Sequence, residues 1–242
     1  PEWYKDAKFG VWAHWDPQCE AAYSDWYARY MYYKDSGAYW NHVNKYGDPC
    51  VPNTEHGYKD LCNAWKAQNW DPDYLISLYR DMGARFFCAM GQHHDNFDCW
   101  DSEYQEWNSV NIGPKRDVVG DWSKACDKYG LPLMVSMHGA HAWTFFENAW
   151  DYDAKMTKED GIGKWWEGYD PNELYAQNHE HSEGWWDSGN IHNQWNWGNG
   201  VCPPSKEYMQ KFQNRVLQCV NKYHPKMLYF DDTVLPFVGH TD

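Results

Sequence analysis

The sequence predicts an α/β protein built as a (β/α)8-type, TIM-like barrel that is incomplete at its carboxyl end. Short apolar runs alternate with amphipathic helical patterns, polar residues follow the ends of the apolar runs, and no glycine-rich phosphate loop follows the first run. This alternation is typical of a parallel sheet covered by helices. A closed barrel takes about 250 residues, whereas the 242 residues here contain four clear strands. We therefore expect one domain over residues 1–242, with the last βα units beyond it.

The predicted strands and helices alternate in order along the chain. Buried strands are expected at residues 9–15 (FGVWAHW) and 85–91 (RFFCAMG), and further strands at residues 131–138 (LPLMVSMH) and 226–232 (KMLYFDD). Helices are expected at residues 71–83, 117–129 and 205–223. The first helix begins with Asp-Pro and stops at Gly83, the second is followed by Gly130, and the third begins at Ser205 and precedes Pro225. A Trp-rich, irregular stretch fills much of the chain between the last two strands.

Composition narrows the classes of partner. The 35 acidic residues outnumber the 21 Lys and Arg, for a net charge of −14, and no run of 18 apolar residues occurs. Nucleic-acid and membrane partners are therefore not expected, because basic patches and long apolar helices hold them.

The 18 Trp are unusually many, and several lie among polar residues, as in 185–187 (WWD) and 193–197 (NQWNW). Indoles in such company suit a sugar, although Trp can equally fill a large core.

The eight cysteines can be interpreted either as buried thiols or as partners in disulfides, which are typical of secreted proteins. Cys88, Cys126 and Cys219 lie inside apolar or helical patterns and are expected to be buried thiols. Disulfides are plausible for the cysteines in loop-like surroundings, which are Cys19, Cys50, Cys62, Cys99 and Cys202. We therefore expect a secreted, periplasmic or lysosome-like location. Because the chain begins at Pro1 without Met or a signal pattern, we also expect a processed product or a fragment.

Polar residues at the predicted strand ends are the candidates for chemistry. Asp231 and Asp232 end the last strand, and a carboxylate there can act as nucleophile, general base, metal ligand or simple turn residue. Since neighbours on a strand point to opposite sides, we expect only one of the two to face a substrate. His93 and His94 follow the second strand and could bind a sugar, bind a metal or lie in a solvated loop. His14 closes the first strand, at the same end.

No metal and no cofactor are expected. The spacings of His138 with His141 and of His179 with His181 offer partners for a metal ion, but neither reproduces HExxH or a comparable zinc signature. Direct contact with substrate is therefore the favoured interpretation of the His93–His94 pair.

Several segments, taken in order, resemble the α-L-fucosidases of glycoside hydrolase family 29. The resemblance covers nearly the whole chain except the region around residues 145–200, and it is specific because the motifs occur together. It is carried by residues 1–4 (PEWY), 7–15 (AKFGVWAHW), 24–29 (SDWYAR), 90–97 (MGQHHDNF), 100–102 (WDS), 107–120 (WNSVNIGPKRDVVG) and 228–231 (LYFD).

This resemblance implies a retaining glycosidase that removes terminal α-L-fucose from oligosaccharides or glycoconjugates through a covalent intermediate on Asp231. It also implies that five side chains line or approach the fucose pocket: His14, Trp26, His93, His94 and His138. A retaining enzyme needs a second carboxyl about 5–5.5 Å from the first to protonate the leaving oxygen. The family's acid/base lies well after the nucleophile, so that residue is unknown here. Loop glutamates that could substitute are Glu55, Glu173, Glu180 and Glu183.

Four departures from the family's usual residues affect the expected shape of the pocket. Asp16 stands where Gly usually follows the His-Trp pair, Asp25 replaces Glu, and Asp232 replaces a frequent Gly. Met137 also stands where a polar or aromatic residue is common. Two alternatives remain open: a non-catalytic fucose-binding relative that has lost its acid/base, and a metal-dependent barrel hydrolase that uses His93, His94 and Asp231.

Overall fold

The computed structural model describes residues 1–176, 179–183 and 202–232. The Trp-rich runs at 185–187 and 193–197, which the sequence associates with sugar binding, lie outside the described residues. The strands are β1 (Val11–Ala13), β2 (Phe87–Gln92), β3 (Leu133–Met137) and β4 (Met227–Phe230). The α-helices are α1 (Glu2–Ala7), α2 (Tyr27–Tyr30), α3 (Gly37–Lys45), α4 (Tyr58–Ala64), α5 (Pro72–Asp81), α6 (Val118–Tyr129), α7 (Ala142–Phe145), α8 (Pro171–Tyr175) and α9 (Lys206–Tyr223). Short 3₁₀ helices are η1 (Pro17–Ala21), η2 (Glu147–Ala149), η3 (Asp153–Lys155) and η4 (Lys158–Gly161).

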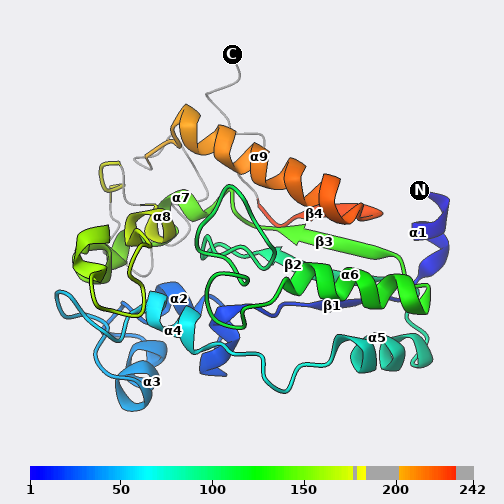
Figure 1. Cartoon of the computed structure of the whole chain (residues 1–242), viewed down its shortest axis with the longest axis horizontal. Coiled ribbons are helices and arrows are strands. Elements are labelled where there is room, and N and C mark those ends of the chain that lie inside the picture. The colour runs from blue at the N-terminus through cyan, green and yellow to red at the C-terminus, as the bar shows by residue number, and fades with distance from the viewer. Residues whose placement is uncertain (177–178, 184–201, 233–242) are drawn as a thin grey trace.

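The four strands form one parallel sheet in the order β1-β2-β3-β4. This confirms the predicted α/β class, and strands that neighbour in sequence also neighbour in space. In a doubly wound sheet the order of the strands reverses at one point across the sheet. The order β1-β2-β3-β4 has no such reversal. Within the described residues the sheet is open, with β1 and β4 at its edges. Figure 1 shows α5, α6 and α9 running alongside the strands.

Helices cover one face of the sheet. Ala89 and Val135 are buried against a core that includes Val119 of α6 and Cys219 of α9. On the opposite face, the Trp12 indole donates to Ser136 Oγ at 3.1 Å. Because side chains alternate along a strand, the sheet has a helix-covered face and a second face formed by residues such as Trp12.

The long helices begin and end at local signals that the sequence contains. Asp71, Asp117 and Ser205 each cap the amino end of a helix, accepting a hydrogen bond from a backbone N–H in the first turn. Gly130 ends α6 with φ 70°, a left-handed conformation that suits glycine. All three predicted helices and all four predicted strands are therefore present, with ends that differ by a few residues.

Two predictions from the sequence need correction. The first strand is not fully buried, because it lies at an edge of the described sheet; Trp12 on β1 is 41% exposed. No disulfide forms, since all eight cysteines are free thiols, and the secreted location loses that support. The loop-like cysteines Cys50, Cys62 and Cys99 are buried as thiols, as are the expected Cys88, Cys126 and Cys219.

The tryptophans divide between core and surface. Trp100, Trp107, Trp143 and Trp166 are fully buried, so for these the core-filling interpretation is correct.

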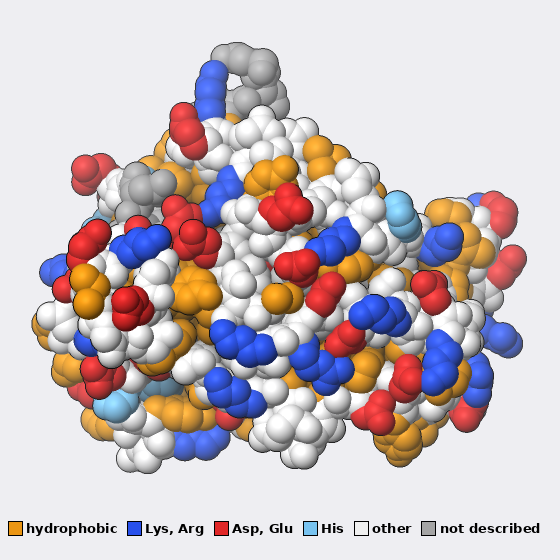
Figure 2. All heavy atoms as spheres, viewed as in Figure 1, with side chains coloured by type: hydrophobic (Ala, Val, Ile, Leu, Met, Phe, Trp, Pro, Cys, Tyr) orange, Lys and Arg blue, Asp and Glu red, His pale blue; other side chains and the backbone are white. Residues whose placement is uncertain are grey.

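No helix in the described ranges is long and apolar enough to cross a membrane. On the face shown in Figure 2, Lys and Arg side chains are interspersed with Asp and Glu.

A buried ion pair joins α9 to the segment that follows β2. The Arg215 side chain, 1% exposed, donates to Asp98 from Nε and from Nη2, with Nη2 2.6 Å from Oδ1. It also donates to the side chain and the backbone carbonyl of Asn96. Asp98 in turn accepts from Gln92 Nε2 at 3.0 Å. Residues 92–98, which include His93 and His94, are therefore tied to α9.

Replacing Arg215 with Ala should lower the free energy of unfolding by about 3–5 kcal/mol, because the Asp98 carboxylate stays buried without its partner. Urea denaturation measures the change. The matched control is Arg80→Ala, which breaks an exposed pair with Asp81 and should alter stability by less than about 1 kcal/mol. Equal effects of the two substitutions would contradict the anchoring role of Arg215.

Candidate active site

Each of the four strands is followed directly by a polar residue that the sequence predicts for the site. His14 follows β1, His93 follows β2, His138 follows β3 and Asp231 follows β4. The backbone N–H of His138 donates to Gln92 O, and that of Asp231 donates to Met137 O, both at 3.1 Å. The ladder of the parallel sheet therefore extends into these residues and brings them to one end of the sheet.

The imidazoles form a packed cluster. The ring centroid of His138 lies 4.8 Å from that of His93, 5.1 Å from that of His14 and 5.2 Å from that of His94. His141 extends the cluster, with its ring 5.2 Å from His94. His14 is exposed, whereas the other four rings are buried. The structure thus brings together all four histidines predicted for the site and adds His141, which the sequence offered only as a metal partner.

Burial keeps these rings neutral. It lowers the pKa of His138 to about 2 and that of His94 to about 3, and it lowers the pKa of His93 well below 6.5. Neighbouring imidazoles add to the effect at His93 and His138, because each would repel a second positive charge. A neutral imidazole has one N–H and one lone pair, so it can both donate to and accept from hydroxyl groups.

Trp26 reaches the same cluster from the segment between η1 and α2. Its ring lies edge-on to His94 with 5.3 Å between centroids, and its backbone has φ 55°. The neighbouring Asp25 places Oδ1 3.7 Å from His93 Nε2. Asp95, in contrast, turns into the core and accepts hydrogen bonds from Tyr58 Oη and Phe97 N.

Asp231 and Asp232 both approach the histidine cluster, each beside a different imidazole. Asp231 Oδ2 lies 3.6 Å from His138 Nδ1, and Asp232 Oδ1 lies 3.8 Å from His94 Nδ1. The strand ends at Phe230, so the alternation rule no longer applies to Asp232. The two carboxyls differ in depth instead: the Asp231 side chain is 44% exposed and that of Asp232 is 0% exposed.

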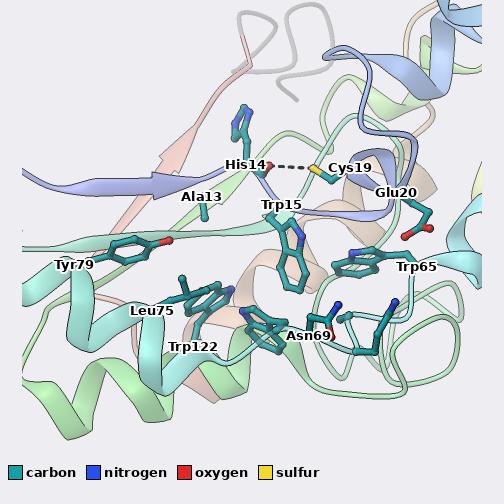
Figure 3. A pocket seen from close by; sticks show the side chains of 13 residues that line it. Ala13, His14, Trp15, Cys19, Glu20, Trp65, Asn69, Leu75, Tyr79 and Trp122 are labelled. Carbon is teal, nitrogen blue, oxygen red and sulfur yellow. Dashed lines mark hydrogen bonds between the residues drawn. The ribbon is translucent and has the colours of Figure 1, made fainter. Parts of the chain in front are cut away.

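Two cavities share His14 in their walls. The first, about 430 Å³, is bordered by Gln18, Asp25 and His93 among other residues. The second, about 470 Å³, is lined by Trp15, Trp65 and other indoles. Figure 3 shows Trp15 extending into this second cavity while the His14 imidazole points away from it. The first cavity, bordered by both His14 and His93, therefore adjoins the histidine cluster, and its volume suits a small ligand.

The cluster contains ligand types that zinc accepts. Within the described residues, two groups of three have ligand atoms within 4.8 Å of one another: His14, His93 and His138, and separately His94, His141 and Asp232. Neither group is the set of His93, His94 and Asp231 suggested for a metal hydrolase. His179 and His181 instead contact indoles, with His179 stacked on Trp143 and His181 beside Trp150.

Gln18 and Tyr229 were missed by sequence reasoning. Gln18 Nε2 lies 2.8 Å from His93 Nδ1, and Tyr229 Oη donates to Asp231 Oδ1 at 3.4 Å. Tyr229 could have been found, because it lies on β4 two residues before Asp231. No local pattern marks Gln18, which meets His93 across 75 positions of sequence.

Comparison with known proteins decides the family. The family model described as Alpha-L-fucosidase matches residues 1–236. The chain belongs to the α-L-fucosidase family. This confirms the resemblance that the motifs around His14, His93 and Asp231 carry.

Individual fucosidases match over part of their length. Tissue α-L-fucosidase of Rattus norvegicus is 30% identical over 137 residues, which are 54% of this chain and 29% of the relative. An α-L-fucosidase of Branchiostoma floridae is 31% identical over 129 residues, covering 52% and 27%. The crystal structure of Thermotoga maritima α-fucosidase in complex with fucose has a TM-score of 0.63 and 26% identity, covering 96% of this chain and 46% of that one. The chain therefore spans less than half the length of the fucosidases it matches.

Asp232 should make stability depend on pH in a way that Asp232→Asn removes. Burial raises the pKa of the folded carboxyl from 3.8 to about 8, so the folded state keeps a proton that the unfolded chain releases. Wild-type stability therefore falls as the pH rises from about 4 to about 8.

Asparagine cannot ionise, so the stability advantage of the Asp232→Asn protein over wild type should grow by about 2–4 kcal/mol as the pH rises from 5 to 8. Urea unfolding of both proteins at the two pH values measures the difference. An identical pH dependence of the two proteins would show that Asp232 titrates normally.

Proposed function

We propose that this protein is a retaining glycosidase that removes terminal α-L-fucose from fucosylated oligosaccharides or glycoconjugates, with Asp231 as its nucleophile. Membership of the α-L-fucosidase family supports the activity. The observation that carries the nucleophile is the position of Asp231, a half-buried carboxyl group beside neutral imidazoles at the carboxyl end of β4. We also propose that residues 1–242 form the N-terminal part of a (β/α)8-type barrel, to which the strand order and the one helix-covered face are suited.

In the proposed reaction, an Asp231 oxygen attacks the anomeric carbon as the bond to the leaving oxygen breaks. A general acid protonates that oxygen, and water then releases fucose from the covalent fucosyl-enzyme intermediate. Tyr229 Oη, which donates to Asp231 Oδ1, and His138 Nδ1, 3.6 Å from Oδ2, would orient the carboxylate. A net retention of configuration follows from two successive displacements at one carbon.

The remaining site residues suit the recognition of a fucose ring. His14, His93, His94 and His138 are clustered imidazoles that can exchange hydrogen bonds with hydroxyl groups. Trp26, edge-on to His94, offers an indole that could cover the apolar edge with the methyl group. The Thermotoga relative named above has been crystallised with fucose, which supports the choice of sugar.

The acid partner stays unassigned. Of the four loop glutamates that could substitute for it, Glu55 pairs with Lys164 and Glu173 pairs with Lys211. Glu180 and Glu183 are exposed. An aryl fucoside avoids the problem, because a good leaving group needs little help from an acid.

Asp231→Gly should lower the rate of aryl α-L-fucoside hydrolysis by about 10⁴-fold or more, because the attacking atom is lost. Added azide should restore turnover and yield fucosyl azide of inverted configuration. Asp81→Asn, an exposed change on α5, is the matched control and should leave the rate unchanged.

Three other outcomes separate the alternatives. Fucose binding by a wild-type protein that hydrolyses no fucoside would favour the non-catalytic relative. Activity that a chelator abolishes and zinc restores would favour the metal-dependent hydrolase. Full activity of the Asp231→Gly protein without azide would refute Asp231 as the nucleophile.

A further inference from the structure

Gln18 forms part of the wall of the cavity that His93 borders. It lies in η1, and it is 6% exposed. Asp16 accepts from its backbone N–H at 3.0 Å and from its side-chain Nε2 at 3.3 Å. The residue is therefore held at both its backbone and its amide group.

The contacts of Gln18 determine which way its amide faces. The backbone N–H of Ala28 can only donate, and it lies 3.1 Å from Gln18 Oε1. The amide nitrogen must therefore lie on the other side, where it meets His93 Nδ1 at 2.8 Å and the Asp16 carboxyl. Both N–H groups of the amide are then used, one on His93 and one on Asp16.

This orientation assigns the proton of His93. An amide nitrogen has no lone pair to offer, so Nδ1 must accept the hydrogen bond from Gln18. Burial lowers the pKa of His93 well below 6.5, so the neutral ring has a single proton, which lies on Nε2. The Asp25 carboxylate 3.7 Å from Nε2 favours the same arrangement.

The next residue is held in the opposite way. His94 Nδ1 lies 3.0 Å from the backbone carbonyl of His138, which can only accept. The proton of the neutral His94 ring therefore lies on Nδ1, and its lone pair lies on Nε2. Two adjacent, buried imidazoles thus have different nitrogens protonated.

We propose that Gln18 is a positioning residue that holds His93 in its Nε2–H tautomer, so that His93 donates a hydrogen bond to a hydroxyl group of the substrate. The choice of a sugar hydroxyl rests on the proposed function, whereas the tautomer rests on the contacts of Gln18 alone. A hydroxyl beside His93 Nε2 would accept from it and donate its own proton to the carboxylate of Asp25. With the other tautomer, His93 and Asp25 would both present acceptors, and a hydroxyl has only one proton to give.

The tautomer is measured directly by ¹⁵N–¹H spectra of protein with labelled histidine, because protonated and unprotonated ring nitrogens have well-separated shifts. The His93 signals are assigned by their loss in His93→Gln. We expect Nε2 to be protonated in wild type. The test variant combines Gln18→Glu with Asp16→Asn. The carboxylate introduced by the first change accepts a hydrogen bond from the amide introduced by the second. It also presents an acceptor, instead of a donor, to His93 Nδ1.

In this double variant the proton of His93 should move to Nδ1, and KM for an aryl fucoside should rise about tenfold while kcat changes little. Asp16→Asn alone keeps the Gln18 amide and should leave the tautomer unchanged. The double variant leaves the net charge unchanged, and Gln68→Glu, on an exposed loop, controls for a Gln-to-Glu change elsewhere in the chain and should change neither readout.

Each outcome bears on one proposal or the other. A wild-type His93 with its proton on Nδ1 overturns the inference, whatever the protein hydrolyses. A reversed tautomer with an unchanged KM also overturns it, because His93 would then make no such bond to substrate. If the tautomer is as proposed and reverses in the double variant, but wild type hydrolyses no fucoside, the inference about Gln18 and His93 is supported and the proposed function fails.

Discussion

The end of the parallel ladder is the constraint on which the site depends. The last backbone hydrogen bonds between β2, β3 and β4 are made by site residues, from His138 N to Gln92 O and from Asp231 N to Met137 O. A slip of one residue in this register would turn every side chain of a strand to the opposite face. The same bonds that hold the strands together therefore set the level at which His138 and Asp231 meet. The ion pair between Arg215 on α9 and Asp98 holds residues 92–98, the segment that includes His93 and His94, in place next to these strand ends.

Packing five histidines together is compatible with folding only if the rings stay neutral. Charged imidazoles about 5 Å apart would repel one another, and burial removes the water that would screen them. The depressed pKa values of His93, His94 and His138 are therefore a consequence of the architecture. Neutral rings have one proton each, so the location of that proton becomes a structural property with its own supports, such as Gln18 for His93 and the His138 carbonyl for His94.

What could be predicted from sequence is what local patterns encode. Strands, capped helices and the strand-end positions of His14, His93, His138 and Asp231 follow from periodicity and from the residues on either side of each element. The buried, unpaired state of Cys50, Cys62 and Cys99 could not be predicted, because loop-like composition does not reveal which loops are covered. The role of Gln18 was equally inaccessible, since it depends on contacts with Ala28 and His93 that only the folded chain brings together.

Three of the four departures from the family's usual residues make sense as a group once their positions are known. Asp16 accepts a hydrogen bond from the amide of Gln18, and Asp25 lies beside His93 Nε2. Asp232 Oδ1 lies 3.8 Å from His94 Nδ1. A glycine at position 16 would leave one amide proton of Gln18 without its present acceptor. A longer carboxylate at position 25 would reach farther into the space beside His93. These three substitutions therefore lie around the two adjacent imidazoles, and under the proposed function they would change the hydrogen bonds that the site offers to a sugar.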